Sequence, residues 1–281
     1  MILNFRSYIT LMRIDKPIGI FLLLWPTLIA LWLASNGVPN VKIVVIFVCG
    51  VFIMRSAGCV INDYADRNFD AHVTRTKNRP IASGTIKANS ALKVFACMLT
   101  VALLLVLQLN TFTILLSCVA AILAIIYPFS KRFTNYPQFI LGLAFAWSIP
   151  MAYAQVQGQL TNETWVLFLS SISWIIAYDT QYAMADKQDD LKVGIKSTAI
   201  AFGVYDKLIV FALQLCCLLG LYSIGVVNNF RWPFYLGLSM ALCLAIYQQW
   251  IIKDRLPQRC MAAFLNNNYF GLVIFIGVML S

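Results

Sequence analysis

The chain has 281 residues, of which 61% are hydrophobic and only 11% are charged, and its mean hydropathy is +0.79. Soluble domains carry roughly 25% charged residues and need far less apolar surface, so this composition excludes a soluble globular protein. The net charge of +10 is spread over short segments between apolar runs instead of forming a groove or a basic tail. That distribution argues against a protein that binds nucleic acid.

Nine apolar stretches of about membrane-spanning length follow one another along the chain. Lipid offers no partner to backbone polar groups, and each stretch is too long for a β-barrel strand, so each is expected to be an α-helix. The predicted fold is an all-α polytopic membrane bundle of about nine transmembrane helices in a single domain covering residues 1–281. The expected spans are residues 18–33, 41–61, 91–109, 112–129, 139–156, 165–178, 208–227, 232–252 and 262–280.

The first apolar run follows Arg6, Arg13 and Lys16 and ends in small residues, as the apolar part of a signal peptide does. Its Trp25-Pro26 pair and the eight later spans favour an uncleaved first helix instead. No long Arg- and Ser-rich transit segment precedes it, which suggests a bacterial chain.

If the helices alternate in direction, the charged residues gather at one end of the bundle. Counting Arg55 with that end, only Lys42 and Arg231 of the 21 basic residues lie at the other end. By the positive-inside rule the basic end is cytoplasmic, which predicts a bacterial inner-membrane protein with a cytoplasmic N-terminus. All of the 11 acidic residues except Glu163 lie at the basic end too, and since carboxylates have little influence on topology, a functional reason is expected.

Cysteine and histidine are not expected to carry chemistry. The eight cysteines lie almost all within apolar spans and form no C-x-x-C pair, so they are interpreted as small packing residues. His72 is the only histidine, which leaves no His-based metal site or catalytic triad.

A first cluster of acids follows the second span. Asn62, Asp66 and Asp70 recur every four residues, and at about 100° per residue they form one helix face with Asp63 at its edge. Carboxylates at this spacing repel one another, so their concentration at a membrane boundary calls for a cation, and all four residues, Asp63 included, are candidate metal ligands.

A second cluster follows the sixth span, four spans later and therefore at the same end of the bundle. Asp186 and Asp190 again stand four residues apart, and Asp179 lies two turns deeper on nearly the same face, where it would hold a ligand group or a tyrosine. Each cluster is followed by a basic, Thr-containing loop and another helix. We interpret the chain as two four-helix units plus one helix, with one motif at residues 62–70 and the other at residues 179–190.

Ligands of this kind suit Mg²⁺, which proteins usually hold with one or two carboxylates and the phosphates of a substrate. Two clusters at one end imply a diphosphate bridged between them. Most of the nearby basic residues also serve topology, but some are candidates to neutralise phosphate oxygens. The candidates are Arg67, Arg75, Lys77, Arg79, Lys131, Arg132, Lys187 and Lys192. The equivalent placement of two clusters argues against the alternative, in which the acids are only solvated loop residues.

These motifs resemble those of the UbiA superfamily of intramembrane aromatic prenyltransferases. Residues 62–70, with Arg75-Thr76 and Arg79-Pro80 after them, resemble its first motif. The form found in the 4-hydroxybenzoate polyprenyltransferase branch resembles residues 15–19, 24–27, 178–190 and 194–198. Gln188 is a departure, because members of this branch often carry another acid there.

The resemblance implies ligands and a reaction. It implies two Mg²⁺ ions, held by Asn62, Asp66 and Asp70 and by Asp186 and Asp190, and diphosphate contacts from Lys131 and Arg132. The implied reaction joins a polyprenyl group from an allylic diphosphate to the carbon beside the hydroxyl of 4-hydroxybenzoate, giving a ubiquinone precursor. Aromatic faces would shield the allylic cation, and the long tail would leave sideways into lipid. The candidates for shielding, each equally suited to packing, are Tyr64, Trp174, Tyr178 and Tyr182.

The carboxylate of the acceptor needs a cation. Arg55 lies two turns deeper than Asn62 on the same helix face, and a buried arginine is costly without a partner. We predict that Arg55 or Arg13 anchors the carboxylate, with Asp179 and Tyr182 beside the acceptor. The alternative, in which Arg55 only pairs with Asp179 or another acid, stays open.

Two other functions stay open as well. Another acceptor, such as dihydroxynaphthoate or homogentisate, is disfavoured only by the resemblance. An ion-coupled transporter is disfavoured because its site would be expected near the bilayer midplane, whereas both clusters lie at one end.

Overall fold

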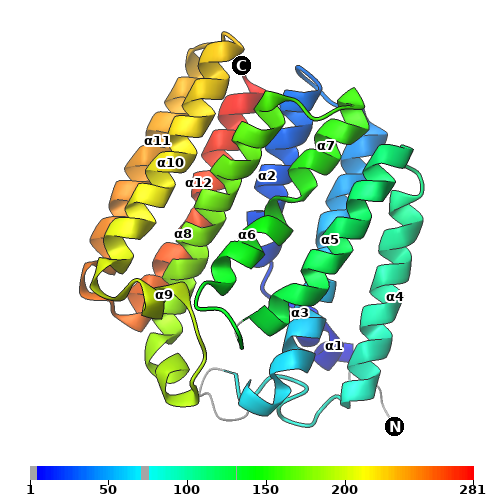
Figure 1. The fold of residues 1–281 in the computed structure, drawn as a ribbon, viewed down its shortest axis with the longest axis vertical. Helices are drawn as coiled ribbons and strands as arrows, with labels where there is room; N and C mark the ends of the chain where they lie inside the picture. Colours follow the sequence, from blue (N-terminus) through cyan, green and yellow to red (C-terminus); the bar gives the residue numbers. More distant parts are fainter. Residues whose placement is uncertain (1–4, 71–75, 131) are drawn as a thin grey trace.

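A computed structural model describes residues 5–70, 76–130 and 132–281, without the side chains of residues 68–70. Within the described residues, nine rods run between the two ends of the molecule, and one of them is a bent pair of helices (Figure 1). This confirms the predicted all-α bundle. The rods are α2 (Ile18–Ala34), α3 (Val41–Asp70), α4 (Ala88–Val106), α5 (Thr111–Ser130), α6 (Pro137–Ala146) with α7 (Ser148–Gln157), α8 (Asn162–Val193), α10 (Asp206–Val227), α11 (Trp232–Ile251) and α12 (Pro257–Met279).

Short helices lie at the lower end of the molecule, where the chain enters and leaves the rods. Figure 1 shows α1 (Phe5–Leu11) and α9 (Thr198–Ala201) there. Two single turns of 3₁₀-helix, η1 (Gly203–Tyr205) and η2 (Ile252–Asp254), precede α10 and follow α11. The apolar pattern predicts none of these elements because they do not cross lipid.

The rods differ in how apolar they are. Among the described residues, seven spans are long and apolar enough to cross a membrane, and α2 is a shorter apolar helix. α8 does not reach the same hydropathy because it is an inner helix, packed against α6, α10 and α12. Its buried Ser170, Ser171 and Trp174 face protein instead of lipid.

The fifth predicted span is broken into α6 and α7 at Trp147. Pro150 has no N–H to donate to the carbonyl of Ala146, and its ring crowds that carbonyl, so the helix breaks one turn before the proline. The Trp147 indole donates a hydrogen bond to the carbonyl of Leu116 on α5 at 2.9 Å, which holds the bend.

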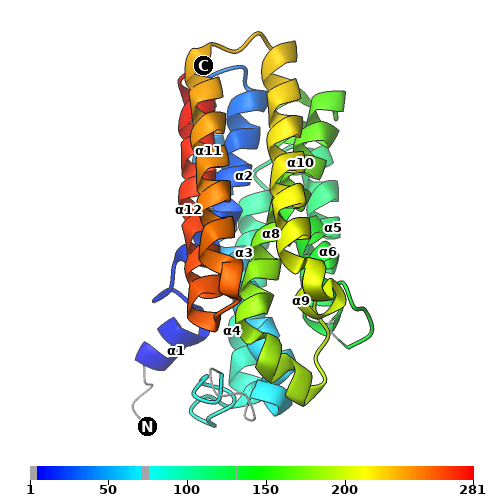
Figure 2. The same cartoon turned by 90° about the vertical axis from the view of Figure 1, so that its left-hand side faces the viewer.

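The helices that carry the two motifs are longer than predicted. The expected spans end at residues 61 and 178, whereas α3 continues to Asp70 and α8 to Val193. Apolarity marks where a helix leaves lipid and not where it ends, so a hydropathy pattern stops short of both motifs. The C-terminal ends of both helices reach the same end of the molecule (Figure 2).

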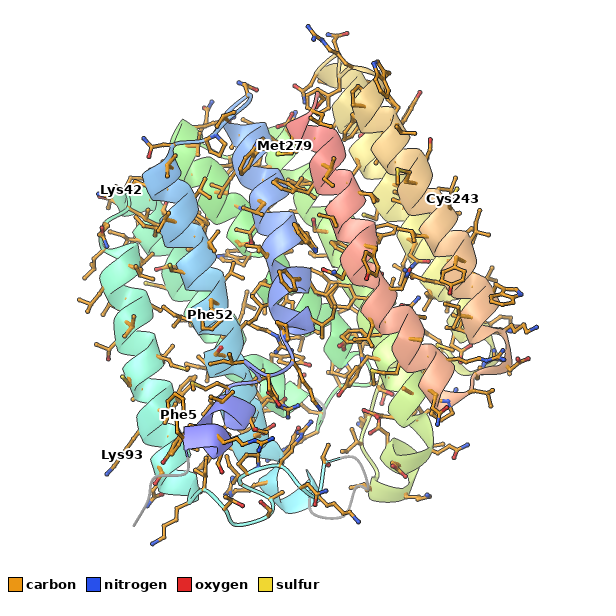
Figure 3. All side chains as sticks on the ribbon, turned by 180° about the vertical axis from the view of Figure 1, so that it is seen from behind. Phe5, Lys42, Phe52, Lys93, Cys243 and Met279 are labelled. Atoms are coloured by element: carbon orange, nitrogen blue, oxygen red, sulfur yellow. The ribbon has the colours of Figure 1, made fainter. Side chains whose placement is uncertain are left out.

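The two ends of the bundle can be told apart by their lysines. Lys42 at the start of α3 lies at one end with Met279, and Lys93 of α4 lies toward the other end with Phe5 of α1 (Figure 3). Both lysines are exposed. The loops that carry most basic residues are therefore at the end of Lys93.

A buried polar network holds α8 in register with the last three rods. The Trp174 indole donates to Asn267 Oδ1 at 2.9 Å, and Asn267 donates to Gln181 Oε1 at 2.7 Å. Gln181 and Gln214 both donate to Gln248 Oε1, at 3.0 and 2.6 Å. Hydrogen bonds between helices in lipid average about 0.6 kcal/mol each, so this network sets orientation more than it adds stability.

Candidate active site

A cavity of about 1350 Å³ opens into the bundle from the end that carries the motifs. Polar residues of α3, α8 and the segment before α2 line part of it, and apolar residues of α2, α3, α4, α5 and α12 line the rest. Leu103 on α4 and Leu265 on α12 line it although they are 53% and 43% exposed, so the cavity reaches the lipid-facing surface at these helices. Such a shape fits an amphiphile with a polar head and a long apolar tail.

The first motif contributes an amide and a carboxylate to the cavity. Asn62 and Asp66 both line it, one turn apart on α3. The Asn62 Oδ1 atom is buried and has no hydrogen-bond partner, and Asp66 is 6% exposed. An acceptor oxygen left unsatisfied in this way is suited to a cation.

The second motif contributes its acids from the other side. Asp179, Tyr182, Asp186 and Asp190 all line the same cavity from α8. The structure thus brings the described acids of the two motifs together, as expected from their placement at equivalent helix ends. Gly194, in the left-handed conformation at φ 76°, ends α8 immediately beyond them.

Asp63 has a different role from the one predicted. Its carboxylate is 1% exposed, and it pairs with Arg13 and with Arg79, each at 3.0 Å from Oδ1. Two guanidinium groups already neutralise this carboxylate, which makes Asp63 less suited to a metal than Asp66. The same pairing engages Arg13, which makes it a poor anchor for an acceptor.

Two cations predicted to bind diphosphate point elsewhere. The Arg67 guanidinium donates to the carbonyl of Tyr64 at 2.6 Å and stacks 4.4 Å from the centre of its ring. Lys187 pairs with Asp206 at 3.5 Å and donates to the carbonyl of Gly203. Neither residue lines the cavity. A basic residue next to a motif in the sequence is therefore not by itself a ligand, because successive residues of a helix point in different directions.

Arg132 connects the loop after α5 to the first motif. Its guanidinium donates to the carbonyl of Ala65 at 2.7 Å, next to Asp66, but the residue does not line the cavity. Its contact with diphosphate stays a prediction. Four residues discussed in the sequence, Asp70, His72, Arg75 and Lys131, have side chains outside those that the structure describes.

Arg55 lies deeper in the cavity with an unsatisfied donor. Its Nε atom is buried without a hydrogen-bond partner, and its guanidinium lies 5.5 Å from the centre of the Phe145 ring. Asp179 on α8 is close enough to Arg55 to interact with it electrostatically, so the alternative in which Arg55 pairs with Asp179 stays open. A buried guanidinium with an unsatisfied donor is an arrangement that suits an anionic ligand.

Composition and residue spacing do not reveal several residues of the site. Gly19 of α2 lies against the Arg55 guanidinium, and an added Cβ would be 2.5 Å from its Nε. Ser197 and Lys196 line the cavity, and the Ser197 hydroxyl is buried without a partner. Thr198 anchors this loop, since its N–H donates to Gln138 at 3.0 Å. In the sequence, only the resemblance of residues 15–19 and 194–198 to family motifs indicates that these residues belong to the site.

A second ion-pair cluster supports the second motif from outside the cavity. Asp206, at the start of α10, is fully buried and accepts hydrogen bonds from Arg255 at 2.7 and 3.0 Å. The hydrogen bonds that Arg255 donates to Asp206 raise the pKa of Arg255 above its ordinary value. Because Lys187 pairs with the same carboxylate, the cluster ties the end of α8 to α10 and to the turn before α12.

The donor set fits a hard divalent cation. Within the described residues, no three acidic, cysteine or histidine side chains lie close enough together to enclose a metal by themselves. Mg²⁺ does not require such a cage, because it usually takes one or two carboxylates and completes its shell with water and substrate phosphate. The unpartnered Asn62 Oδ1, with Asp66, Asp186 and Asp190 around one cavity, supplies oxygen atoms of this kind.

The fold and the cavity together define a helical membrane bundle with a cavity whose lining suits an amphiphile. The model of the UbiA prenyltransferase family matches residues 23–273, and the chain belongs to this family.

Relatives and solved structures agree with this assignment. The chain is 55% identical to a protein of Tolumonas auensis named 4-hydroxybenzoate octaprenyltransferase, over 99% of this chain and 97% of that protein. A protein of the same name from Coxiella burnetii is 52% identical over 98% and 96% of the two chains. The fold resembles that of a UbiA homolog from Aeropyrum pernix, with a TM-score of 0.80, 20% identity and coverage of 93% and 96%. A UbiA homolog from Archaeoglobus fulgidus, described as bound to GPP and Mg²⁺, has a TM-score of 0.73 at 17% identity, with coverage of 97% and 99%.

Proposed function

We propose that this chain transfers a polyprenyl group from an allylic polyprenyl diphosphate to 4-hydroxybenzoate in ubiquinone biosynthesis. The products are 3-polyprenyl-4-hydroxybenzoate and diphosphate. The observation that carries the proposal is that relatives more than half identical, over almost their whole length, bear the name 4-hydroxybenzoate octaprenyltransferase. The cavity supports it with an acidic end, a buried cation and apolar walls.

The metal ligands we propose are Asn62, Asp66, Asp186 and Asp190, together with Asp70. Bound Mg²⁺ would withdraw electron density from the diphosphate and so favour ionisation of the allylic C–O bond. Lys196, which lines the cavity beside the second motif, is a better placed diphosphate ligand than Arg67 or Lys187. Lys131 and Arg132 remain proposed diphosphate ligands.

The residues of the chain then orient the acceptor and exclude water. The Arg55 guanidinium holds the carboxylate of 4-hydroxybenzoate, and Asp179 and Tyr182 lie beside the ring. The C–O bond breaks with its electron pair on the diphosphate, the ring carbon beside the hydroxyl forms a C–C bond, and that carbon then loses its proton. The walls at Phe145 and Phe264 keep water from the allylic cation.

The prenyl tail and the bundle each have a proposed place in the membrane. The tail of the prenyl substrate follows the apolar lining toward the lipid-facing surface. The end with most basic residues faces the cytoplasm of a bacterial cell, and the bundle lies in the inner membrane.

The experiment that tests the acceptor compares three aromatic acids in washed membranes with one allylic polyprenyl diphosphate and Mg²⁺. We expect prenylated product with 4-hydroxybenzoate and none with dihydroxynaphthoate or homogentisate, with the new C–C bond beside the hydroxyl by NMR. Turnover of either other acid at a comparable rate, without turnover of 4-hydroxybenzoate, would overturn the acceptor assignment. Membranes that lack the chain are the control.

A further inference from the structure

Tyr178 on α8 has a buried hydroxyl with no hydrogen-bond partner, and the residue lines the cavity. It is 1% exposed. The rings of Trp174 and Phe264 pack edge-on against it, with centroids 5.6 and 6.0 Å away, so its ring is held in place. A phenol buried among aromatic rings normally finds a partner for its hydroxyl, which points to a partner supplied by a ligand.

Arg55 on α3 presents a similar situation. Its Nε donor is buried and unpartnered, it lines the same cavity, and Tyr178 is close enough to interact with it electrostatically. Two buried donors that approach one space from α3 and α8 match a ligand with two acceptor oxygens. A carboxylate is such a ligand, because when ionised it accepts hydrogen bonds on both oxygens and donates none.

We propose that Tyr178 donates a hydrogen bond from Oη to the carboxylate of the aromatic acceptor, beside the Arg55 guanidinium. This rests on the proposed function and makes Tyr178 a residue that determines specificity for acids. With both oxygens held, the ring can no longer rotate away from the allylic carbon, so the carbon beside the acceptor hydroxyl is the one that reacts. Shielding of the allylic cation requires only the ring of Tyr178, whereas this role requires its hydroxyl.

The test measures steady-state kinetics of Tyr178→Phe, which removes the hydroxyl and keeps the ring. We expect KM for 4-hydroxybenzoate to rise about tenfold, the effect of losing one hydrogen bond to a charged group, with KM for the prenyl diphosphate unchanged. Tyr153→Phe is the matched control, because Tyr153 is equally buried but donates to Glu163, away from the cavity. Both KM values should be unchanged in the control. If the Tyr178→Phe protein is not recovered folded, Tyr178→Met is measured with benzoate instead, because Ki for benzoate reports binding of the carboxylate and not shielding of the allylic cation.

Inhibition by benzoate shows which end of the acceptor Tyr178 contacts, since benzoate keeps the carboxylate and lacks the hydroxyl. If Tyr178 binds the carboxylate, Ki for benzoate rises by the same factor as KM in Tyr178→Phe. An unchanged Ki beside a raised KM would assign Tyr178 to the acceptor hydroxyl and overturn the proposal, and so would an unchanged KM. If the wild type does not prenylate 4-hydroxybenzoate, the proposed function fails instead, and the two failures are distinguished.

Discussion

Gly19 controls the position of Arg55, because the guanidinium occupies the space where a Cβ would stand. In Gly19→Ala the end of the arginine side chain must move, since it is more flexible than the backbone of α2. We expect KM for 4-hydroxybenzoate to rise about tenfold with little change in stability. Gly142→Ala, at a helical glycine outside the cavity lining, should leave KM unchanged. Equal KM values in the wild type and Gly19→Ala would show that Arg55 does not bind the acceptor.

Asp63 and Asp66 should respond differently to the loss of their charges. Asp63→Asn leaves Arg13 and Arg79 without their shared carboxylate, and we expect it to lower the free energy of unfolding by about 3 kcal/mol. The Mg²⁺ concentration for half-maximal activity should stay unchanged, whereas Asp66→Asn should raise it. Thermal unfolding in detergent and Mg²⁺ titrations measure the two effects. A raised Mg²⁺ requirement in Asp63→Asn would show that Asp63 binds the metal.

At the scale of residues, the position of a side chain could be predicted from the sequence where it follows from helix geometry. Asn62, Asp66, Asp186 and Asp190 line one cavity because four-residue spacing repeats a helix face. The pairing of Asp63 was not predictable, since Arg79 lies on a loop whose path the sequence does not define.

At the scale of elements, the cluster at Asp206 joins three helices, and its loss should loosen the second motif. Asp206→Asn removes the charge between Arg255 and Lys187 in a fully buried position, and we expect a loss of about 3 kcal/mol in the free energy of unfolding. The control is Asp254→Asn, which breaks an exposed pair with Arg259 and should cost about 0–1 kcal/mol. Equal melting temperatures for both variants would contradict a structural role for the cluster.

The elements themselves were predictable from apolar length, but their ends and bends were not. The rods of α2, α4 and α5 lie within a few residues of the expected spans because lipid sets their length. α3 and α8 continue beyond lipid, where hydropathy carries no information. The break before Pro150 has a local signal in the proline, yet many membrane helices tolerate proline, as α2 does at Pro26.

At the scale of the whole molecule, the orientation of the bundle can be tested with two single cysteines. Lys42→Cys and Lys93→Cys place thiols toward opposite ends (Figure 3). A membrane-impermeant thiol reagent applied to intact spheroplasts should label Lys42→Cys at once and Lys93→Cys only after permeabilisation. The wild type, with eight native cysteines, gives the background. The reverse order of labelling would contradict a cytoplasmic site.

The central claim is that the two acidic motifs act together with Mg²⁺ to prenylate 4-hydroxybenzoate. The most direct measurement follows radiolabelled 4-hydroxybenzoate into lipid in washed membranes given an allylic polyprenyl diphosphate, with Mg²⁺ or with EDTA. We predict labelled lipid only with Mg²⁺, and its loss in both Asp66→Ala and Asp186→Ala at wild-type protein levels. Labelled lipid that persists in EDTA, or in either variant, would contradict a shared metal site.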